Sequence, residues 1–172
     1  MDFYSVLKAR HSVRAFSDKE VSNSQIEKII GSFMLAPSAG NLQAYRVYYT
    51  KNPDLKKELA AACMEQECVE QASVVFIFCA DKEQGASKYG ERGYDFYSLQ
   101  DATIAAAYAQ LSTAAEGLGS VWVGAFDPLE VSRLINAEPH IVPVAVLPVG
   151  HAAEEPGLRE RRTVTDIVKE VK

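Results

Sequence analysis

The chain has 172 residues, of which 48% are hydrophobic and 24% charged, a composition typical of a globular protein with a substantial core. Its net charge of −5 argues against a general nucleic-acid-binding protein, because such a protein needs a basic face to displace counterions. No apolar run approaches the roughly 20 residues that span a bilayer, so no membrane association is expected.

The first residues, with Phe3, Tyr4, Val6 and Leu7, predict a short amphipathic helix that ends before residue 10. This start lacks the basic region and apolar run of a signal peptide. The three cysteines are odd in number and contain no C-x-x-C pair. Together these features predict a cytoplasmic, reduced protein.

A compact set of hydrogen-bond donors follows this helix, in Arg10-His11-Ser12-Val13-Arg14. The planar fork of an arginine fits phosphate oxygens in pairs, so the segment suits a phosphate group. A second basic cluster lies far away in the sequence, in Arg159-Glu160-Arg161-Arg162. If folding brings the two clusters together they form an anion clamp; otherwise both are solvated surface charge.

The next stretch predicts a helix that starts at Ser22 to Gln25 and repeats apolar residues at helical spacing: Ile26, Ile29, Ile30, Phe33 and Met34. It should end at a loop over residues 36–41, because Pro37 disfavours helix before it and Gly40-Asn41 tolerates left-handed geometry. Residues 45–50 are β-branched and aromatic and predict a strand, after which Pro53-Asp54 opens a short helix.

The apolar run over residues 73–80 predicts a central strand covered on both faces, with Cys79 as a buried thiol. Residues 82–97 alternate glycine with aromatic residues and read as irregular, either a mobile aromatic flap or an ordinary surface loop. The segment 99–118 is rich in alanine and poor in charge. It predicts a helix packed closely on several sides, as at the centre of a domain or of a dimer.

The rest of the sequence predicts a third strand over residues 120–126 and a short helix opened by Asp127-Pro128. A fourth strand is predicted over 141–150, where Pro143 and Pro148 indicate a sheet edge or the strand ends. The polar stretch 152–162 should be extended, and 164–171 is either a last helix or a strand. Without an internal repeat or linker, residues 1–172 form one α+β domain.

Side-chain catalysts and metal sites have no clear signal in the sequence. It contains no H-E-x-x-H, nucleophile elbow or Walker loop, and His11, His140 and His151 are too scattered for a metal site. The Gly117-Leu118-Gly119 segment follows a predicted helix, whereas a dinucleotide fingerprint must follow a strand. An enzyme without an evident acid, base or nucleophile often leaves the difficult step to a cofactor.

Taken in order, several stretches resemble the FMN-dependent nitroreductase family: Arg10 to Arg14, Ala36 to Asn41 with Gln43, the alanine-rich helix ending in Gly117 to Gly119, Trp122 to Phe126, Pro148 to His151, and Arg159-x-Arg161. The chain departs from the family at His11, where a second arginine is frequent, and at Ala44-Tyr45, where Pro-Trp is common. The resemblance implies a nitroreductase-like α+β fold, with a central mixed, mainly antiparallel sheet flanked by helices. It also implies an intertwined homodimer with flavin at the interface.

The resemblance also implies roles for particular residues. Arg10, His11 and Ser12 would hold the FMN phosphate or ribityl chain, with Arg159 and Arg161 closing on the phosphate. Arg14 would reach the pyrimidine edge of the flavin and tune its redox potential. Residues of the other subunit would line the ring: Pro37, Ser38, Ala39 and Asn41.

The third predicted strand supplies the last set of flavin contacts that the resemblance implies. Gly124 and Ala125 would place a backbone N–H near flavin N5, with Trp122 and Val123 packed beside it. From the sequence alone, Trp122 is equally well a core aromatic residue. Ser38 and Asn41 could likewise form a simple turn.

The implied activity is that of an FMN-dependent oxidoreductase. Hydride would pass in a ping-pong cycle from NAD(P)H through flavin N5 to a small electron-poor acceptor, such as a nitroaromatic or quinone, with no metal and no catalytic side chain. FMN is favoured over FAD. The alternatives are a related flavoprotein that cleaves flavin or removes halogen, and a flavin-binding carrier or sensor without turnover.

Overall fold

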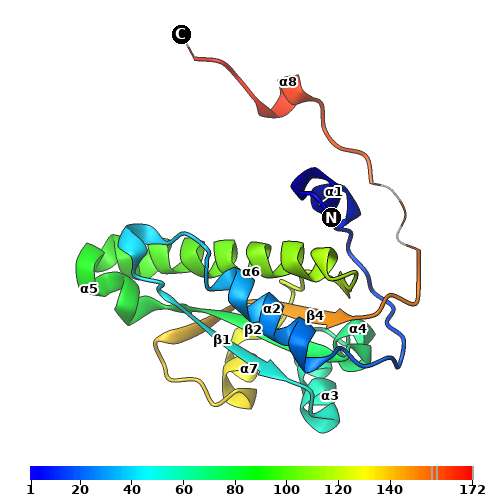
Figure 1. The fold of residues 1–172 in the computed structure, drawn as a ribbon. Coiled ribbons are helices and arrows are strands. Elements are labelled where there is room, and N and C mark those ends of the chain that lie inside the picture. Colours follow the sequence, from blue (N-terminus) through cyan, green and yellow to red (C-terminus); the bar gives the residue numbers. More distant parts are fainter. Residues whose placement is uncertain (156, 158, 172) are drawn as a thin grey trace.

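The computed structural model describes residues 1–155, 157 and 159–171. Its centre is a four-stranded antiparallel sheet in the order β1-β2-β4-β3 (Figure 1). The strands are β1 (Tyr45–Thr50), β2 (Val74–Asp81), β3 (Gly119–Ser120) and β4 (Ile141–Gly150). One parallel bridge joins Ser12 to Ser120. The predicted α+β class with a mainly antiparallel sheet flanked by helices is confirmed.

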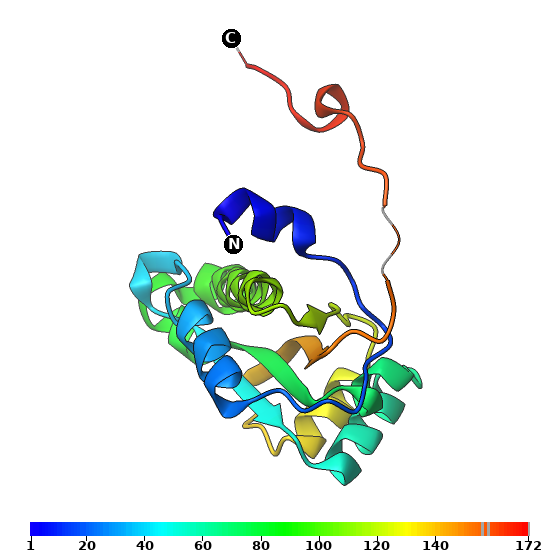
Figure 2. The same ribbon diagram turned by 45° about the vertical axis from the view of Figure 1, so that its right-hand side comes forward.

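Helices cover both faces of the sheet (Figures 1 and 2). The apolar residues of α2 (Asn23–Phe33) and α6 (Ser98–Ala115) pack on one face, against Phe76 and Phe78 of β2. The other face carries α3 (Pro53–Ala62), α4 (Glu67–Gln71) and α7 (Pro128–Leu134), which pack on Val75, Ile77 and Cys79. Because successive strand residues point to opposite faces, the fully apolar β2 feeds both layers, as predicted.

Local capping explains where several helices begin. The Ser22 side chain accepts from Gln25 N, and the Gln25 side chain bonds the Ser22 backbone, which makes a capping box at the start of α2. Asn52 caps α3 and Asp127 caps α7, each followed by a proline in the first helical turn. These signals are local in sequence, and the three predicted helix starts are confirmed.

The interpretation of residues 82–97 as irregular is wrong, since they form α5 (Lys82–Arg92) and a π-helical stretch (Gly93–Tyr97) that continues into α6. Gly90 adopts a φ of 54°, which turns the chain between the two arms of this helical hairpin. Gly85 and Gly93 are both buried where the arms meet. These two glycines therefore allow the helical arms to pack closely and do not mark a loop.

Replacing Gly93 with alanine should lower the free energy of unfolding by about 2 kcal/mol, because a Cβ there would lie 2.0 Å from the carbonyl oxygen of Gly85 and force the arms apart. Gly31→Ala is the matched control, since a Cβ at this exposed helical position meets nothing within 4 Å. Urea denaturation measures both. Equal stability of Gly93→Ala and the wild type would contradict the close approach.

The predicted third strand is shorter than expected. Regular pairing ends at Ser120, and among residues 121–126 Val123 alone forms a bridge, with Val146. β4 is an internal strand, so of the two interpretations of its prolines the sheet edge is wrong. Pro143 and Pro148 are each the third residue from one end of the strand, which agrees with the other interpretation. Val146 exchanges backbone hydrogen bonds with Val123, on the side of β4 that faces β3. The backbone nitrogen of Pro148, two residues on, faces the same side. Pairing with β3 is interrupted there, so the missing N–H of proline is tolerated.

Both ends of the chain lie outside the sheet layers. The N-terminal helix α1 (Phe3–Ala9) lies above α6, and the residues after β4 lead away from the body to the single turn α8 (Val164–Ile167) (Figures 1 and 2). We call the described residues after β4 the C-terminal arm. Four of its apolar side chains are exposed: Val164, Ile167, Val168 and Val171. Over the described residues, none of the helices has both the length and the apolar character to span a bilayer.

The three cysteines are free and buried, which confirms the buried thiol at Cys79. Burial raises the pKa of the Cys63 and Cys79 thiols to about 12 and also raises the pKa of Cys68. A thiol with a raised pKa stays protonated and unreactive until the pH approaches that value.

The native protein should therefore react with an aromatic disulfide reagent at about pH 8 at least about 100-fold more slowly than the protein in guanidinium chloride, where thiols regain a pKa near their ordinary value. Absorbance of the released thiolate follows the reaction. Prompt release of one equivalent by the native protein would show that a thiol is accessible, contrary to this packing.

Candidate functional site

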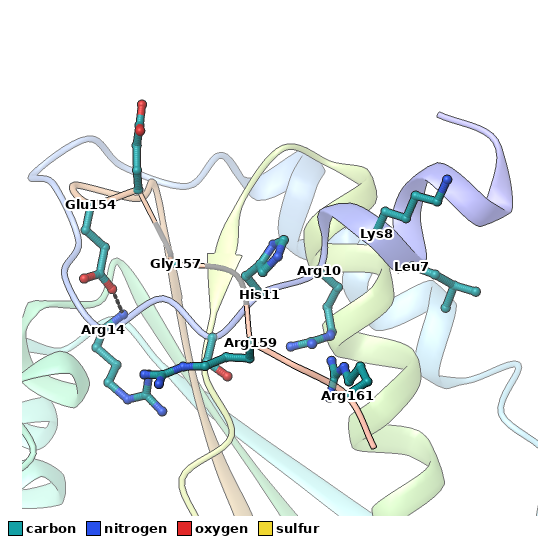
Figure 3. A pocket seen from close by; sticks show the side chains of 11 residues that line it. Leu7, Lys8, Arg10, His11, Arg14, Glu154, Gly157, Arg159 and Arg161 are labelled. Carbon is teal, nitrogen blue, oxygen red and sulfur yellow. Dashed lines mark hydrogen bonds between the residues drawn. The ribbon is translucent and has the colours of Figure 1, made fainter. Parts of the chain in front are cut away.

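The two basic clusters meet at one cavity of about 520 Å³ (Figure 3). Its walls come from the end of α1, the segment that follows α1, and the C-terminal arm. The lining residues are Leu7, Lys8, Arg10, His11, Ser12, Arg14, Glu154, Glu155, Gly157, Arg159 and Arg161. Of the predicted site residues, the structure therefore brings together Arg10, His11, Ser12, Arg14, Arg159 and Arg161.

Backbone hydrogen bonds hold the first cluster beside the sheet. Val13 N donates to Ser120 O at 3.0 Å, which fixes the segment along β3. Gly119 allows this approach, because a Cβ there would lie 2.9 Å from Val13 Cβ. Further along, Ser17 N donates to His151 O and Ala153 N donates to Ala15 O, both at 2.9 Å. The segment after α1 is thus paired with the residues that lead into the second cluster.

The cavity has an excess of positive charge. Its four arginines and one lysine face two carboxylates, of which Glu154 accepts a hydrogen bond from the backbone N of Arg14 at 2.5 Å (Figure 3). Among the ion pairs of the described residues, none engages any of these four arginines. Guanidinium groups beside a serine hydroxyl form a donor set that fits a phosphate group.

The loop over residues 36–41, which is predicted to line a flavin ring, does not lie at the cationic cavity. Ala39 N contacts Asp101 near the start of α6, whereas Arg10 and His11 share a pocket with Ala114 and Gly117 at the end of that helix. Asp101 and Ala114 lie 13 residues apart along α6, which corresponds to about 20 Å. Within one chain, Pro37, Ser38, Ala39 and Asn41 are therefore not brought to the cationic cavity.

The residues after β3 occupy two environments. Trp122 is half-buried against the core that contains Phe76, and Val123 is 1% exposed. Gly124 and Ala125 are exposed, and their N–H groups have no protein partner within the described part of the chain. Gln66 Nε2 donates to Ala125 O at 3.3 Å and holds this segment against the turn before α4.

Four further residues of these regions were not predicted from the sequence: Lys8, Glu154 and Glu155 in the cavity, and the buried Asp101 beside residues 39–44. Glu154 meets Arg14 from 140 positions away in the chain, which no local pattern reports. A signal for Asp101 was present, because an acid among the alanines of the predicted central helix requires partners for its charge.

Known proteins resemble this chain over nearly its whole length. The family model described as the nitroreductase family matches residues 7–83 and 64–151. The chain is 31% identical over 165 residues to a Methanothermobacter thermautotrophicus protein whose name places it among NADH dehydrogenases and NAD(P)H nitroreductases, covering 93% of this chain and 82% of that protein. It is 28% identical over 163 residues to the FMN reductase (NADPH) of Bacillus subtilis, covering 87% and 66%.

Solved structures have the same fold. The structure of B. megaterium NfrA2 superposes with a TM-score of 0.92 at 25% identity and covers all of this chain and 75% of that one. The NfrA1 nitroreductase from B. subtilis gives a TM-score of 0.91 at 26% identity, over 99% of this chain and 74% of the other.

Proposed function

The chain belongs to the nitroreductase family, and from this premise we propose that it is an FMN-dependent oxidoreductase that takes electrons from NAD(P)H. The observation that carries the proposal is the cationic cavity, where two clusters about 150 residues apart present four arginines to one space. Related proteins are named as FMN reductases and as an NADPH-flavin oxidoreductase. Residues 1–172 act as one flavin-binding domain in this proposal.

The cavity residues bind and orient the cofactor. Arg10, Ser12, Arg159 and Arg161 hold the phosphate, and His11 holds the phosphate or the ribityl chain. Arg14 reaches the pyrimidine edge of the ring, where a positive charge favours the addition of electrons. When bound, FMN supplies the hydride chemistry, so no side chain has to act as acid, base or nucleophile.

The exposed segment after Val123 completes the ring site in this proposal. Over the described residues the backbone N–H groups of Gly124 and Ala125 have no protein partner and would face flavin N5, while Val123 and Trp122 pack in the two core clusters. A backbone donor next to the Val123–Val146 bridge is held more rigidly than a side chain, and this favours a fixed approach of the ring. The electron acceptor in this proposal is a small electron-poor molecule, a nitroaromatic or a quinone.

The protein acts as an intertwined homodimer. Pro37, Ser38, Ala39 and Asn41 do not line the cavity of their own chain, and in the proposed dimer a second copy brings them to the flavin ring. Apolar side chains of α1, such as Phe3 and Tyr4, and those of the C-terminal arm are exposed in the single chain. Association of two copies would bury them, which is a strong driving force.

Equilibrium titration with FMN, followed by steady-state oxidation of NADPH with a quinone acceptor, tests the proposed activity. We expect flavin absorbance to remain with the protein after gel filtration, and NADPH oxidation to require both FMN and the quinone. Sedimentation should give the mass of two chains. A protein that takes up no FMN, or that binds it as a monomer, would contradict the proposal.

A further inference from the structure

The loop over residues 38–44 has an unusual backbone. Gly40, Asn41 and Gln43 have φ values of 57°, 58° and 50°. Side-chain-bearing residues rarely occupy this left-handed region, and glutamine is less suited to it than asparagine. Such conformations persist only where the surrounding contacts impose them, and they cluster at binding sites.

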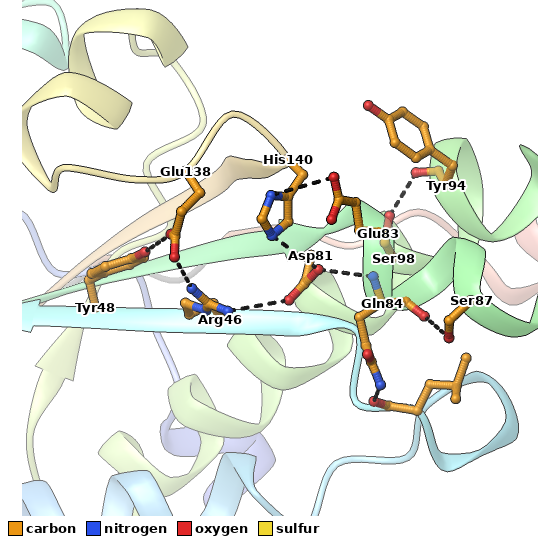
Figure 4. Close-up of polar contacts among 11 residues, drawn as sticks. Arg46, Tyr48, Asp81, Glu83, Gln84, Ser87, Tyr94, Ser98, Glu138 and His140 are labelled. Atoms are coloured by element: carbon orange, nitrogen blue, oxygen red, sulfur yellow. Dashed lines mark hydrogen bonds and ion pairs between the residues drawn. The ribbon is translucent and has the colours of Figure 1, made fainter.

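Backbone hydrogen bonds within the loop account for part of this shape: Asn41 N donates to Ser38 O at 3.0 Å, Leu42 N to Ala39 O at 3.1 Å and Tyr45 N to Gln43 O at 2.7 Å. Ser38 Oγ accepts from Gln43 N at 2.9 Å and closes the loop on itself. From α5, Gln84 Nε2 donates to Leu42 O at 3.2 Å (Figure 4), and Asp81 N donates to Ala44 O at 3.0 Å. The short 3-10 turn Ala39–Asn41 has no cap from its own N-cap side chain.

Asp101 joins the two ends of the loop to α6. Its Oδ1 accepts from Ala39 N at 2.9 Å and its Oδ2 accepts from Ala44 N at 3.3 Å, so one carboxylate ties both ends of the loop. The residue is 2% exposed on the alanine face of α6, and no ion pair of the described residues includes it.

A buried carboxylate without a cation is unfavourable unless hydrogen bonds compensate it. For the helix alone, alanine would be the better residue at this position, as it is at the neighbouring buried positions. An acidic residue at this position is therefore explained by its hydrogen bonds to the loop, and not by any benefit to α6.

We infer that Asp101 is a positioning residue for the flavin ring, which fixes the 38–44 loop in the shape that receives the ring of the cofactor held by the partner chain. The inference rests on the proposed function, because Ser38, Ala39 and Asn41 contact the ring only in the proposed dimer. The phosphate is held by other elements. Asp101 should therefore govern the affinity for the ring and leave the affinity for the phosphate unchanged.

Dissociation constants for FMN and for riboflavin, which lacks the phosphate, test this division in the full-length protein by quenching of flavin fluorescence. In Asp101→Asn the single remaining acceptor oxygen cannot serve both loop ends, and the amide NH₂ faces a backbone N–H. We expect both flavins to bind about tenfold more weakly, with the ratio of the two constants unchanged.

Asp95→Asn is the matched control. This carboxylate lies on the π-helical stretch before α6, is exposed, and pairs with Lys82 at 3.7 Å without contacting the loop. It should leave both constants within about twofold of wild type, as expected for an exposed pair. Unchanged affinities in Asp101→Asn, or a loss confined to FMN, would overturn the inference.

Hydrogen exchange in the wild-type protein without flavin gives an answer that does not depend on whether the variant folds. The amides of Ala39 and Ala44 should be as well protected as those in the middle of α6, and exchange at the rate of exposed loop amides would overturn the inference. Wild-type protein that binds neither flavin would contradict the proposed function and this inference with it. Binding of both flavins with no effect at Asp101 would overturn the inference alone.

Discussion

Replacing Arg10 and Arg161 together with alanine should weaken FMN binding by at least about 100-fold, because each guanidinium forms charge-assisted hydrogen bonds with the phosphate. The two side chains come from the two clusters and line the same cavity (Figure 3). Riboflavin lacks the phosphate, so its affinity should change by no more than about twofold. Fluorescence titration measures both flavins.

Arg133→Ala is the control for the loss of an arginine. Arg133 lies on α7, is exposed, and pairs with Glu130 at 2.7 Å. It lies outside the cavity, so FMN affinity should stay within about twofold of wild type. Equal losses for FMN and riboflavin in the double variant would mean that the two clusters do not form a phosphate site.

Arg14→Ala should slow reduction of the bound flavin by NADPH about 10- to 100-fold and lower its reduction potential, because a positive charge at the pyrimidine edge favours the state that has gained electrons. The backbone N of Arg14 is bonded to Glu154, so the segment keeps its position in the variant. Rapid mixing at saturating FMN separates this effect from weaker binding.

Arg14→Lys distinguishes charge from shape. Lysine keeps the positive charge but lacks the planar fork of donors. The potential should remain close to that of the wild type, while FMN affinity falls. A potential unchanged in Arg14→Ala would place the guanidinium away from the ring and contradict its assigned role.

The elements with local signals were predictable. The starts of α2, α3 and α7 follow from caps within a few residues of each helix, and β2 from a continuous apolar run. The helical structure of residues 82–97 could not be predicted from their glycines, because the role of these glycines is tertiary. Gly85 and Gly93 are required by a contact between two helical arms, whereas a glycine in isolation reads as a turn.

The candidate site likewise contains parts that are visible in the sequence and parts that depend on tertiary contacts. Both basic clusters were visible as clusters, but the pairing of Val13 with Ser120 and of Ala15 with Ala153 is what brings them together. Glu154 accepts from a backbone N–H far away in the sequence, and a backbone partner leaves no trace in residue types. Asp101 stands out in the sequence as an acid among alanines, but its partners Ala39 and Ala44 become apparent only when the fold is known.

Anaerobic rapid mixing of the FMN-loaded protein with NADPH tests the central claim most directly, because it requires flavin binding and electron uptake in one observation. The visible flavin band should bleach promptly, with one NADPH consumed for each flavin bound. A flavin band that persists with excess NADPH, or a protein that holds no flavin to bleach, would contradict the account.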